Sequence, residues 1–185
     1  MKSGKIVLIG PSGSGKTAFC MKAKHNNVPI QISATIGCDF FAVIKQINNE
    51  EIKLLVWDTA GQEVYRTFTP QFTRGAVVVL LFDSLTNPQN DYQLESWMKY
   101  LDKDSIIIVV PSKCDLCENT PVPVKFDTQG RELIYAKPIS SVKNINIDSL
   151  LDQIASIVYE KSKLKKSSSW DIDRSEEKNE SCCNI

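Results

Sequence analysis

Residues 10–17 read Gly-Pro-Ser-Gly-Ser-Gly-Lys-Thr and follow Lys5–Ile9, an apolar run typical of a buried strand. Glycines at this spacing let backbone N–H groups turn inward around phosphate oxygens, and a helix beginning here adds the positive end of its dipole. Lys16 is expected to reach the β- and γ-phosphates, and the Thr17 hydroxyl to ligate Mg²⁺. The motif and its context therefore predict a nucleoside-phosphate site rather than a glycine-rich turn. The other expected nucleotide contacts here are Ser12, Gly13, Ser14, Gly15 and Ala18.

A second polar segment, Asp58-Thr59-Ala60-Gly61-Gln62-Glu63, follows the apolar run Ile52–Trp57. The carboxyl ends of parallel strands meet at one sheet edge, so Asp58 is expected beside the phosphate loop, where it can hold Mg²⁺ through water. The Gly61 N–H can contact a γ-phosphate, and Gln62 has the donor and acceptor that orient an attacking water. Without the phosphate loop, Asp58 would be as well explained by a turn.

The elements that must position these residues alternate between short apolar runs and helical stretches. The expected strands are Lys5–Ile9, the hairpin of Phe40–Ile47 and Ile52–Trp57 around a turn at Asn48–Glu51, Ala76–Phe82, Ile106–Val110 and the weaker Ala136–Ile139. The expected helices are Thr17–Lys24, Tyr92–Leu101 and Ile147–Leu164. Such alternation predicts an α/β fold with a mainly parallel sheet.

The composition excludes several classes of function. The 185 residues carry 22 Lys+Arg against 22 Asp+Glu, which argues against a nucleic-acid binder because that function needs a basic surface. The longest apolar run, Ala76–Phe82, is far shorter than a membrane span, and Met1–Gly10 does not have the apolar core of a signal peptide. Cys114 and Cys117 have CxxC spacing, but neither a redox nor a zinc role is favoured. Lys165–Ile185 is rich in Ser, Lys and Glu, and is expected to be disordered.

With these motifs, the chain resembles the small GTPases of the Ras superfamily and, among them, the Rab family. The resemblance covers about Lys5–Leu164 and the last four residues. It is carried by the phosphate loop, Thr35-Ile36-Gly37-Cys38-Asp39-Phe40, Trp57–Glu63 and Ser112-Lys113-Cys114-Asp115. The stretch Tyr65–Ala76 is similar to a Rab second switch. The resemblance implies a P-loop NTPase G domain at residues 1–164, with a six-stranded, mainly parallel sheet flanked by helices, and a hypervariable tail at 165–185.

The resemblance also implies how the protein works. Thr35 would ligate Mg²⁺ and meet the γ-phosphate only in the GTP state, so that Asn26–Asp39 and Gly61–Arg74 form two switches. The implied activity is slow GTP hydrolysis, with Lys16 and Gln62 as catalytic residues, in a regulator of vesicle traffic. Implied partners are an exchange factor, a GTPase-activating protein, and effectors that read the switches and an aromatic triad of Phe40, Trp57 and Phe72.

The guanine end departs from the family pattern. Asp115 can accept from guanine N1–H and the 2-amino group, which adenine does not offer, and Lys113 can lie over the base. Ser112 stands where the family has Asn and is too short to make all of its hydrogen bonds. Val28 stands where an aromatic ring is usual. The loop Ser141-Val142-Lys143, preceded by Ser140, resembles the family's last guanine-binding motif. These departures predict weaker nucleotide holding without loss of guanine specificity.

The chain ends Cys182-Cys183-Asn184-Ile185, a terminal cysteine pair typical of prenylated Rab-like proteins. Two lipids give a stable anchor, which implies prenylation machinery, a lipid-binding chaperone and a location on the cytoplasmic face of an intracellular membrane, in exchange with cytosol. Two other functions stay open at this point. One is a pseudo-GTPase scaffold, favoured by Ser112, Val28 and Pro111; the other is an ATP-using P-loop phosphotransferase, which Asp115 opposes.

Overall fold

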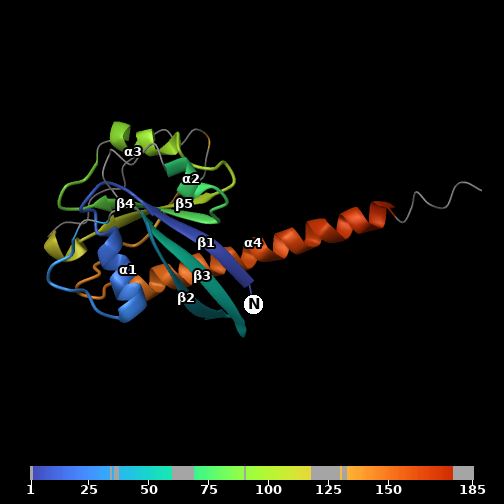
Figure 1. Ribbon diagram of the computed structural model, residues 1–185, viewed down its shortest axis with the longest axis horizontal. Helices are drawn as coiled ribbons and strands as arrows, with labels where there is room; N and C mark the ends of the chain where they lie inside the picture. Colours follow the sequence, from blue (N-terminus) through green and yellow to red (C-terminus); the bar gives the residue numbers. More distant parts are fainter. Residues whose placement is uncertain are drawn as a thin grey trace, which may run out of the picture.

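Figure 1 shows the computed structural model, a twisted sheet with helices on both faces. It describes residues 2–33, 35, 38–59, 69–89, 91–117, 130 and 133–176, without the side chains of 69, 91–92 and 165–176. The strands are β1 (Lys2–Ile9), β2 (Cys38–Ile47), β3 (Glu50–Thr59), β4 (Val78–Ser84), β5 (Ile106–Ser112) and β6 (Leu133–Tyr135). The helices are α1 (Lys16–His25), α2 (Thr69–Thr73), α3 (Asp91–Met98), the 3-10 turn η2 (Cys114–Leu116) and α4 (Ile147–Glu176).

The six strands form one sheet in the order β2-β3-β1-β4-β5-β6, which confirms the predicted fold class. All neighbours are parallel except β2 and β3, which form the predicted antiparallel hairpin. The turn between them is shorter than the four residues expected, because only Asn48 and Asn49 lie outside the strands. Both have positive φ, 50° and 65°, as a tight two-residue hairpin turn requires.

Side chains that alternate along the central strands separate two cores. Ile6 and Leu8 of β1 pack with residues of α1 and α4 on one face of the sheet. Val7 and Ile9 pack on the other face, against α3. Figure 1 shows α1 and α4 on the opposite side of the sheet from α2 and α3. Because both faces are covered there, Ile6–Ile9 of β1 and Val78–Phe82 of β4 are continuous apolar runs. Their carboxyl ends lead to one edge, where the phosphate loop lies.

The strand expected at Ala136–Ile139 is wrong: β6 is the preceding segment, Leu133–Tyr135. The expected segment does run beside β5, since Ala136 N–H donates to Val109 O at 2.9 Å and Ile139 N–H to Pro111 O at 2.8 Å. Between these two bonds stands Pro138, which has no N–H to donate. The ladder is therefore interrupted where the apolar residues suggested that it would continue.

The last helix also differs from expectation. The apolar pattern ends near Leu164, whereas α4 continues through Glu176. The disorder expected of the tail from Lys165 onward stays a prediction. Extending a docked helix adds one hydrogen bond for each residue fixed, without the cost of nucleation. Figure 1 shows this part of α4 leading away from the sheet. Residues 177–185 lie outside the described residues. None of the described helices is long and apolar enough to cross a bilayer.

Helix α4 meets β1 at a glycine. A Cβ added to Gly4 would lie 2.6 Å from Val158 Cγ2, so a larger residue here would push the helix off the sheet. On the edge strand β2, Lys45 Nζ lies 2.7 Å from Asp152 Oδ1 and 3.5 Å from Asp148 Oδ1 of the same helix. Close packing and ion pairing thus fix the amino-terminal half of α4 against the sheet.

Candidate nucleotide site

The phosphate loop turns between β1 and α1 through glycines in conformations that other residues rarely adopt. Gly10 has φ +135°, and a Cβ on it would lie 2.4 Å from Phe82 O, so this position excludes any side chain. Gly15 caps α1 with φ 94° and ψ 10°, in the left-handed region. The helix starts at Lys16, and the N–H groups of its first turn, which have no carbonyl of an earlier turn, point toward the loop.

Lys16 crosses the phosphate loop. Its buried ammonium group donates to Gly10 O at 2.9 Å, Pro11 O at 2.8 Å and Ser14 Oγ at 3.4 Å. Burial lowers the pKa of Lys16 to about 8, an effect that the negative charge of Asp58 opposes. A cation held by neutral oxygens in a buried loop is a strong site for an anion, because a phosphate would compensate its lost hydration.

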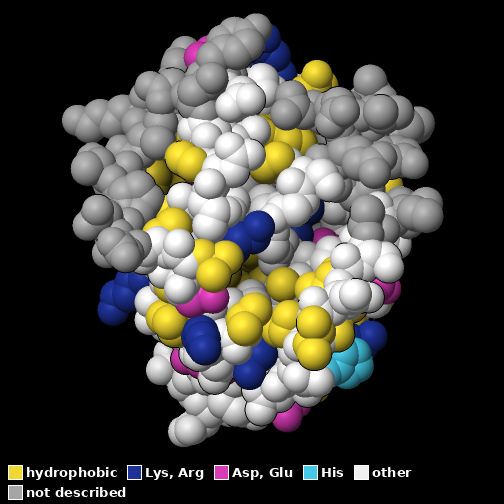
Figure 2. Space-filling view, turned by 90° about the vertical axis from the view of Figure 1, so that its left-hand side faces the viewer, with side chains coloured by type: hydrophobic (Ala, Val, Ile, Leu, Met, Phe, Trp, Pro, Cys, Tyr) yellow, Lys and Arg dark blue, Asp and Glu magenta, His cyan; other side chains and the backbone are white. Residues whose placement is uncertain are grey.

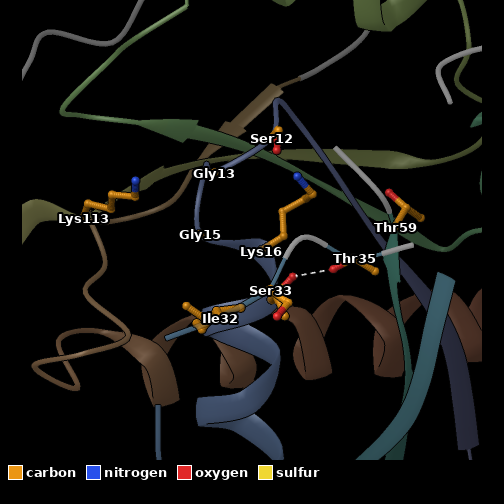
Figure 3. Close-up of a pocket in the computed structure, with 11 residues that line it drawn as sticks. Ser12, Gly13, Gly15, Lys16, Ile32, Ser33, Thr35, Thr59 and Lys113 are labelled. Carbon is orange, nitrogen blue, oxygen red and sulfur yellow. Dashed lines mark hydrogen bonds between the residues drawn. The ribbon is translucent and has the colours of Figure 1, made fainter. Parts of the chain in front are cut away.

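Three oxygen-bearing side chains from three segments meet beside this lysine. Thr17 Oγ1 of α1 donates to Asp58 Oδ2 at 2.7 Å and lies 2.8 Å from Thr35 Oγ1 (the dashed line ending at Thr35 in Figure 3). Thr35 Oγ1 is also 3.4 Å from the same carboxylate oxygen. The predicted metal ligands are thus brought together, although they are far apart in the sequence.

The donor set fits a magnesium ion. Two hydroxyls and a carboxylate are the hard oxygen ligands that Mg²⁺ takes, usually together with waters and phosphate oxygens. Asp58 Oδ1 is buried and has no hydrogen-bond partner among the described residues, which leaves one carboxylate oxygen for a metal-bound water. Burial raises the pKa of Asp58, while its bonds to Thr17 and the charge of Lys16 lower it. A divalent cation here would favour the charged carboxylate.

A cavity of about 330 Å³ opens over these groups, and Figure 3 shows Lys16 and Lys113 reaching it from different sides. Its lining includes eight of the predicted site residues: Ser12, Gly13, Gly15, Lys16, Thr17, Ala18, Thr35 and Lys113. Among the described residues, Ile32, Ser33 and Thr59 also line it and were not among the predicted site residues. No motif distinguishes Ile32 and Ser33 from other loop residues. Thr59 could have been predicted, because it follows Asp58 directly at the carboxyl end of β3.

The face shown in Figure 2 is hollowed, and hydrophobic side chains gather around the hollow. The predicted first switch carries two isoleucines in contact with solvent, since Ile30 is fully exposed and Ile32 is 37% exposed. Val28, the position where the family pattern has a ring, is half-buried and does not line the nucleotide cavity. Hydrophobic surface is therefore available near the cavity, but Val28 does not provide it.

Ser112 lies beneath the cavity rather than in its wall. It is 3% exposed, and its hydroxyl lies 2.6 Å from Ser14 O of the phosphate loop and 3.2 Å from Asp83 O at the end of β4. A hydroxyl has a single proton to donate, and here two backbone carbonyls share it. Ser112 therefore fastens the phosphate loop to the neighbouring strands. The sequence analysis predicted neither the bond of Ser112 to the phosphate loop nor its bond to the backbone carbonyl of Asp83.

The residues expected around the base come from two adjacent loops. Lys113, with φ 61°, lines the cavity and precedes η2, which contains the half-buried Asp115. The loop of Ser141, Val142 and Lys143 is fixed beside it, because Cys114 N–H donates to Ile139 O at 3.1 Å and Lys143 N–H to Ser140 Oγ at 3.0 Å. Asp115 and these three loop residues do not line the described cavity. Val142 is 66% exposed.

The aromatic residues singled out in the sequence lie along the switch side of the sheet. Phe40 and Trp57 are cross-strand partners in β2 and β3, with ring centroids 5.0 Å apart. Trp57 and the half-buried Phe72 pack against the α3-side core, and Phe40 remains 48% exposed. Lys5 Nζ lies 5.0 Å from the Trp57 ring centroid. Gly61 and Gln62, and the cysteines Cys182 and Cys183, lie outside the described residues.

The sheet order, the phosphate loop and the oxygen cluster define a P-loop nucleotide-binding protein of the G-domain type, and comparison with known proteins agrees. The Ras family model matches residues 5–160. The chain is 34% identical to the Ras-related protein RABA4d of Arabidopsis thaliana, over 84% of this chain and 72% of that protein. It is 32% identical to human Ras-related protein Rab-3D, over 85% and 74%. Against Ras-related protein Rab-13 of Mesocricetus auratus, the identity is 30% over 98% and 95%.

The chain belongs to the Rab family within the Ras superfamily. It is therefore a GTPase that binds GTP and GDP and hydrolyses GTP to GDP, and exchange factors, activating proteins and effectors are its general kinds of partner. This assignment contradicts an ATP-using phosphotransferase, and it gives no support to a scaffold that has lost GTPase activity.

Proposed function

We propose that this protein is a GTP-dependent switch that regulates vesicle traffic, recruiting effectors in its GTP state. The observation that carries the proposal is the cluster of Thr17, Thr35 and Asp58. It joins the phosphate-loop helix, the first switch and the end of β3 at the place where a nucleotide's terminal phosphates would lie. A ligand there can change how the first switch is held, and that is the requirement for a switch.

At the phosphate end, Thr17 and Thr35 would ligate Mg²⁺, and Asp58 would hold it through water. When bound, the ion neutralises phosphate charge that develops in the transition state. Lys16 turns from its loop carbonyls to the β- and γ-phosphates, and backbone N–H groups of Ser12–Ala18 surround the remaining oxygens. Thr35 reaches the γ-phosphate only while it is present, so hydrolysis releases the first switch.

For hydrolysis, Gln62 orients the attacking water and the Gly61 N–H contacts the γ-phosphate. These roles rest on the family motif, since both residues lie outside the described part of the chain. The sequence offers no evident arginine finger in cis. We therefore expect slow intrinsic hydrolysis, with an activating protein supplying charge worth about 10³–10⁵ in rate.

At the base end, Asp115 accepts from guanine N1–H and the 2-amino group, Lys113 lies over the ring, and the backbone of Ser141, Val142 and Lys143 meets the guanine oxygen. The Ser112 hydroxyl already donates to carbonyls, so we propose that it adds no strong bond to the base. Together with the half-buried Val28, this supports weaker nucleotide holding than in a relative with the full motif.

Effectors would read the switches and the triad of Phe40, Trp57 and Phe72, because an exposed aromatic ring next to a movable loop offers a surface that changes with the nucleotide. The C-terminal Cys182 and Cys183 would carry two prenyl lipids, added by prenylation machinery and shielded in cytosol by a lipid-binding chaperone. The protein would then work on the cytoplasmic face of an intracellular membrane.

The test is whether guanine nucleotide binding depends on Mg²⁺ through Asp58. Purified protein should carry guanine nucleotide, identified by chromatography, and chelation of Mg²⁺ should accelerate GDP release. An Asp58→Ala protein should release GDP fast with or without chelator, whereas Asp104→Ala, an exposed aspartate at the far end of the sheet, should behave as wild type. The proposal would be contradicted if adenine nucleotide co-purified with the protein, or if the GDP release rate of the wild-type protein did not change on chelation of Mg²⁺.

A further inference from the structure

Two cysteines enclose the residue expected to select guanine. Cys114 and Cys117 stand on either side of Asp115 and Leu116, at the start of η2 and just after it. Both thiol-bearing residues are partly exposed, and Leu116 between them is 67% exposed. The turn is thus open to small molecules in solvent. Neither cysteine has a role in the nucleotide chemistry described above.

The backbone places the two cysteines within reach of each other. The Cys117 N–H points to Cys114 O at 3.5 Å, which closes a turn of the i to i+3 kind. Such turns keep the first and fourth α-carbons within about 7 Å, and disulfides span α-carbon distances of about 4.4–6.8 Å.

The other described cysteines are placed differently. Cys20 is buried on α1, inside the α4-side core, where burial raises its pKa strongly. Cys38 lies on β2, beside the oxygen cluster, and burial raises its pKa to about 11. Neither adjoins a second cysteine in a turn. Cys38 therefore offers a control for general thiol oxidation.

We propose that Cys114 and Cys117 form a reversible internal disulfide, which weakens guanine binding through Asp115 between them. The second clause rests on the proposed function, whereas the first does not. The turn-closing bond is long at 3.5 Å, so a covalent link between the two side chains draws the turn tighter. Asp115 then moves relative to Lys113, which lines the cavity, and the paired hydrogen bonds from its carboxylate to a planar base tolerate little displacement.

The oxidant is a small disulfide such as oxidised glutathione. One cysteine thiolate attacks it and forms a mixed disulfide, releasing one glutathione thiolate; the second cysteine thiolate attacks the protein-side sulfur and releases the other. Two thiol protons are lost, and two electrons pass from the protein to glutathione. Burial and the negative charge of Asp115 raise the pKa of Cys114, so the reaction is slow at neutral pH and faster in mild alkali.

Disulfide formation is tested first, independently of nucleotide. Full-length protein equilibrated in glutathione buffers of increasing oxidised fraction should lose two hydrogens overall, and peptide mapping should locate the link between Cys114 and Cys117. Cys117→Ser and Cys117→Ala proteins should form only mixed disulfides with glutathione, and Cys38→Ser should behave as wild type. Mixed disulfides alone in the wild-type protein, or a link between other cysteines, would overturn the assignment.

The consequence is tested by GDP release. Oxidised wild-type protein should release GDP about tenfold faster than reduced protein, the effect of losing about one hydrogen bond to the base, and reduction should restore the slow rate. Reduced Cys117→Ser should release GDP like reduced wild type and should not respond to the oxidant. If the mapped disulfide forms and release is unchanged, regulation of guanine binding is wrong while the disulfide stands. If reduced protein does not bind guanine nucleotide, the proposed function itself has failed.

Discussion

At the phosphate end of the site, Lys16 and Thr17 leave the first turn of α1 directly into the cavity, and Asp58 and Thr35 meet them there. At the base end, the Ser112 hydroxyl turns away from the cavity to carbonyls of the protein itself. In the first region, the described hydroxyls, carboxylate and ammonium group already lie together where the phosphates would bind. In the second region, the Ser112 side chain of the recognition motif holds the phosphate loop in place. We therefore expect substitutions at the two ends to affect nucleotide binding to different extents, with Ser112 linking the two ends through its bond to Ser14 O.

The largest expected effect is at the phosphate end. Lys16→Ala removes a buried cation that would make charge-assisted bonds to the phosphates, and should weaken GDP binding by about 100- to 1000-fold. Lys24→Ala, on the exposed part of the same helix, is the matched control and should leave binding unchanged. Equilibrium titration with GDP measures both. A loss of less than about fivefold for Lys16→Ala would mean that backbone donors alone hold the phosphates.

The next effect sharpens the role of Ser112. Ser112→Ala removes the hydroxyl bonds to two buried carbonyls and frees the phosphate loop, and should accelerate GDP release by about ten- to a hundredfold. Ser112→Asn, which restores the family residue, should slow release. Ser105→Ala is the control, since that buried hydroxyl donates to Ala76 O at 2.8 Å far from the cavity. Ser105→Ala should lower the free energy of unfolding without altering GDP release. Equal GDP release rates for the two alanine variants would contradict the proposal that Ser112 holds the phosphate loop in place.

A smaller effect, about tenfold, is expected from pH. The pKa of Lys16 is lowered to about 8 in the free protein, and bound phosphate favours the charged ammonium and so raises it. GDP binding then takes up a proton above about pH 8, and affinity falls by about tenfold toward pH 9. The free energy of unfolding of the nucleotide-free protein should instead rise as the pH increases above about 8. The reason is that Lys16 keeps its proton to higher pH in the unfolded chain than in the folded one. Calorimetry in buffers of different ionisation enthalpy would detect the uptake; pH-independent binding would exclude this role of Lys16.

The smallest effect concerns Val28. Val28→Phe adds a ring where the family places one, and should slow GDP release by about three- to fivefold through contact with the base. Val28→Leu adds apolar volume without a ring and should change release less. If both variants act alike, hydrophobic cover rather than ring stacking limits nucleotide holding at this end of the site.

The central strands and the phosphate loop could be predicted because their signals are local. Ile6 to Ile9 form a run covered on both faces, and the glycines at 10 and 15 stand where positive φ is needed. The base end depends on contacts between distant segments. Nothing in the sequence shows that Ser112 turns toward Ser14, or that Ile32 enters the cavity wall. The prediction of a strand at Ala136–Ile139 was wrong because it rested on the apolar residues alone. It did not take into account that Pro138 has no N–H to donate to the ladder.

The contact of Gly4 with Val158 has a mechanical consequence. Strand β1 is hydrogen-bonded on both sides, to β3 and to β4, so a force along it must shear two ladders at once. Helix α4 packs on that strand through the Val158 side chain, which reaches the backbone because Gly4 has no side chain. Tension applied to α4 would reach β1 through this contact, and the carboxyl end of β1 leads into the phosphate loop. A tethered molecule under load would therefore resist rupture at the centre of its fold, and would convey strain along β1 to the nucleotide.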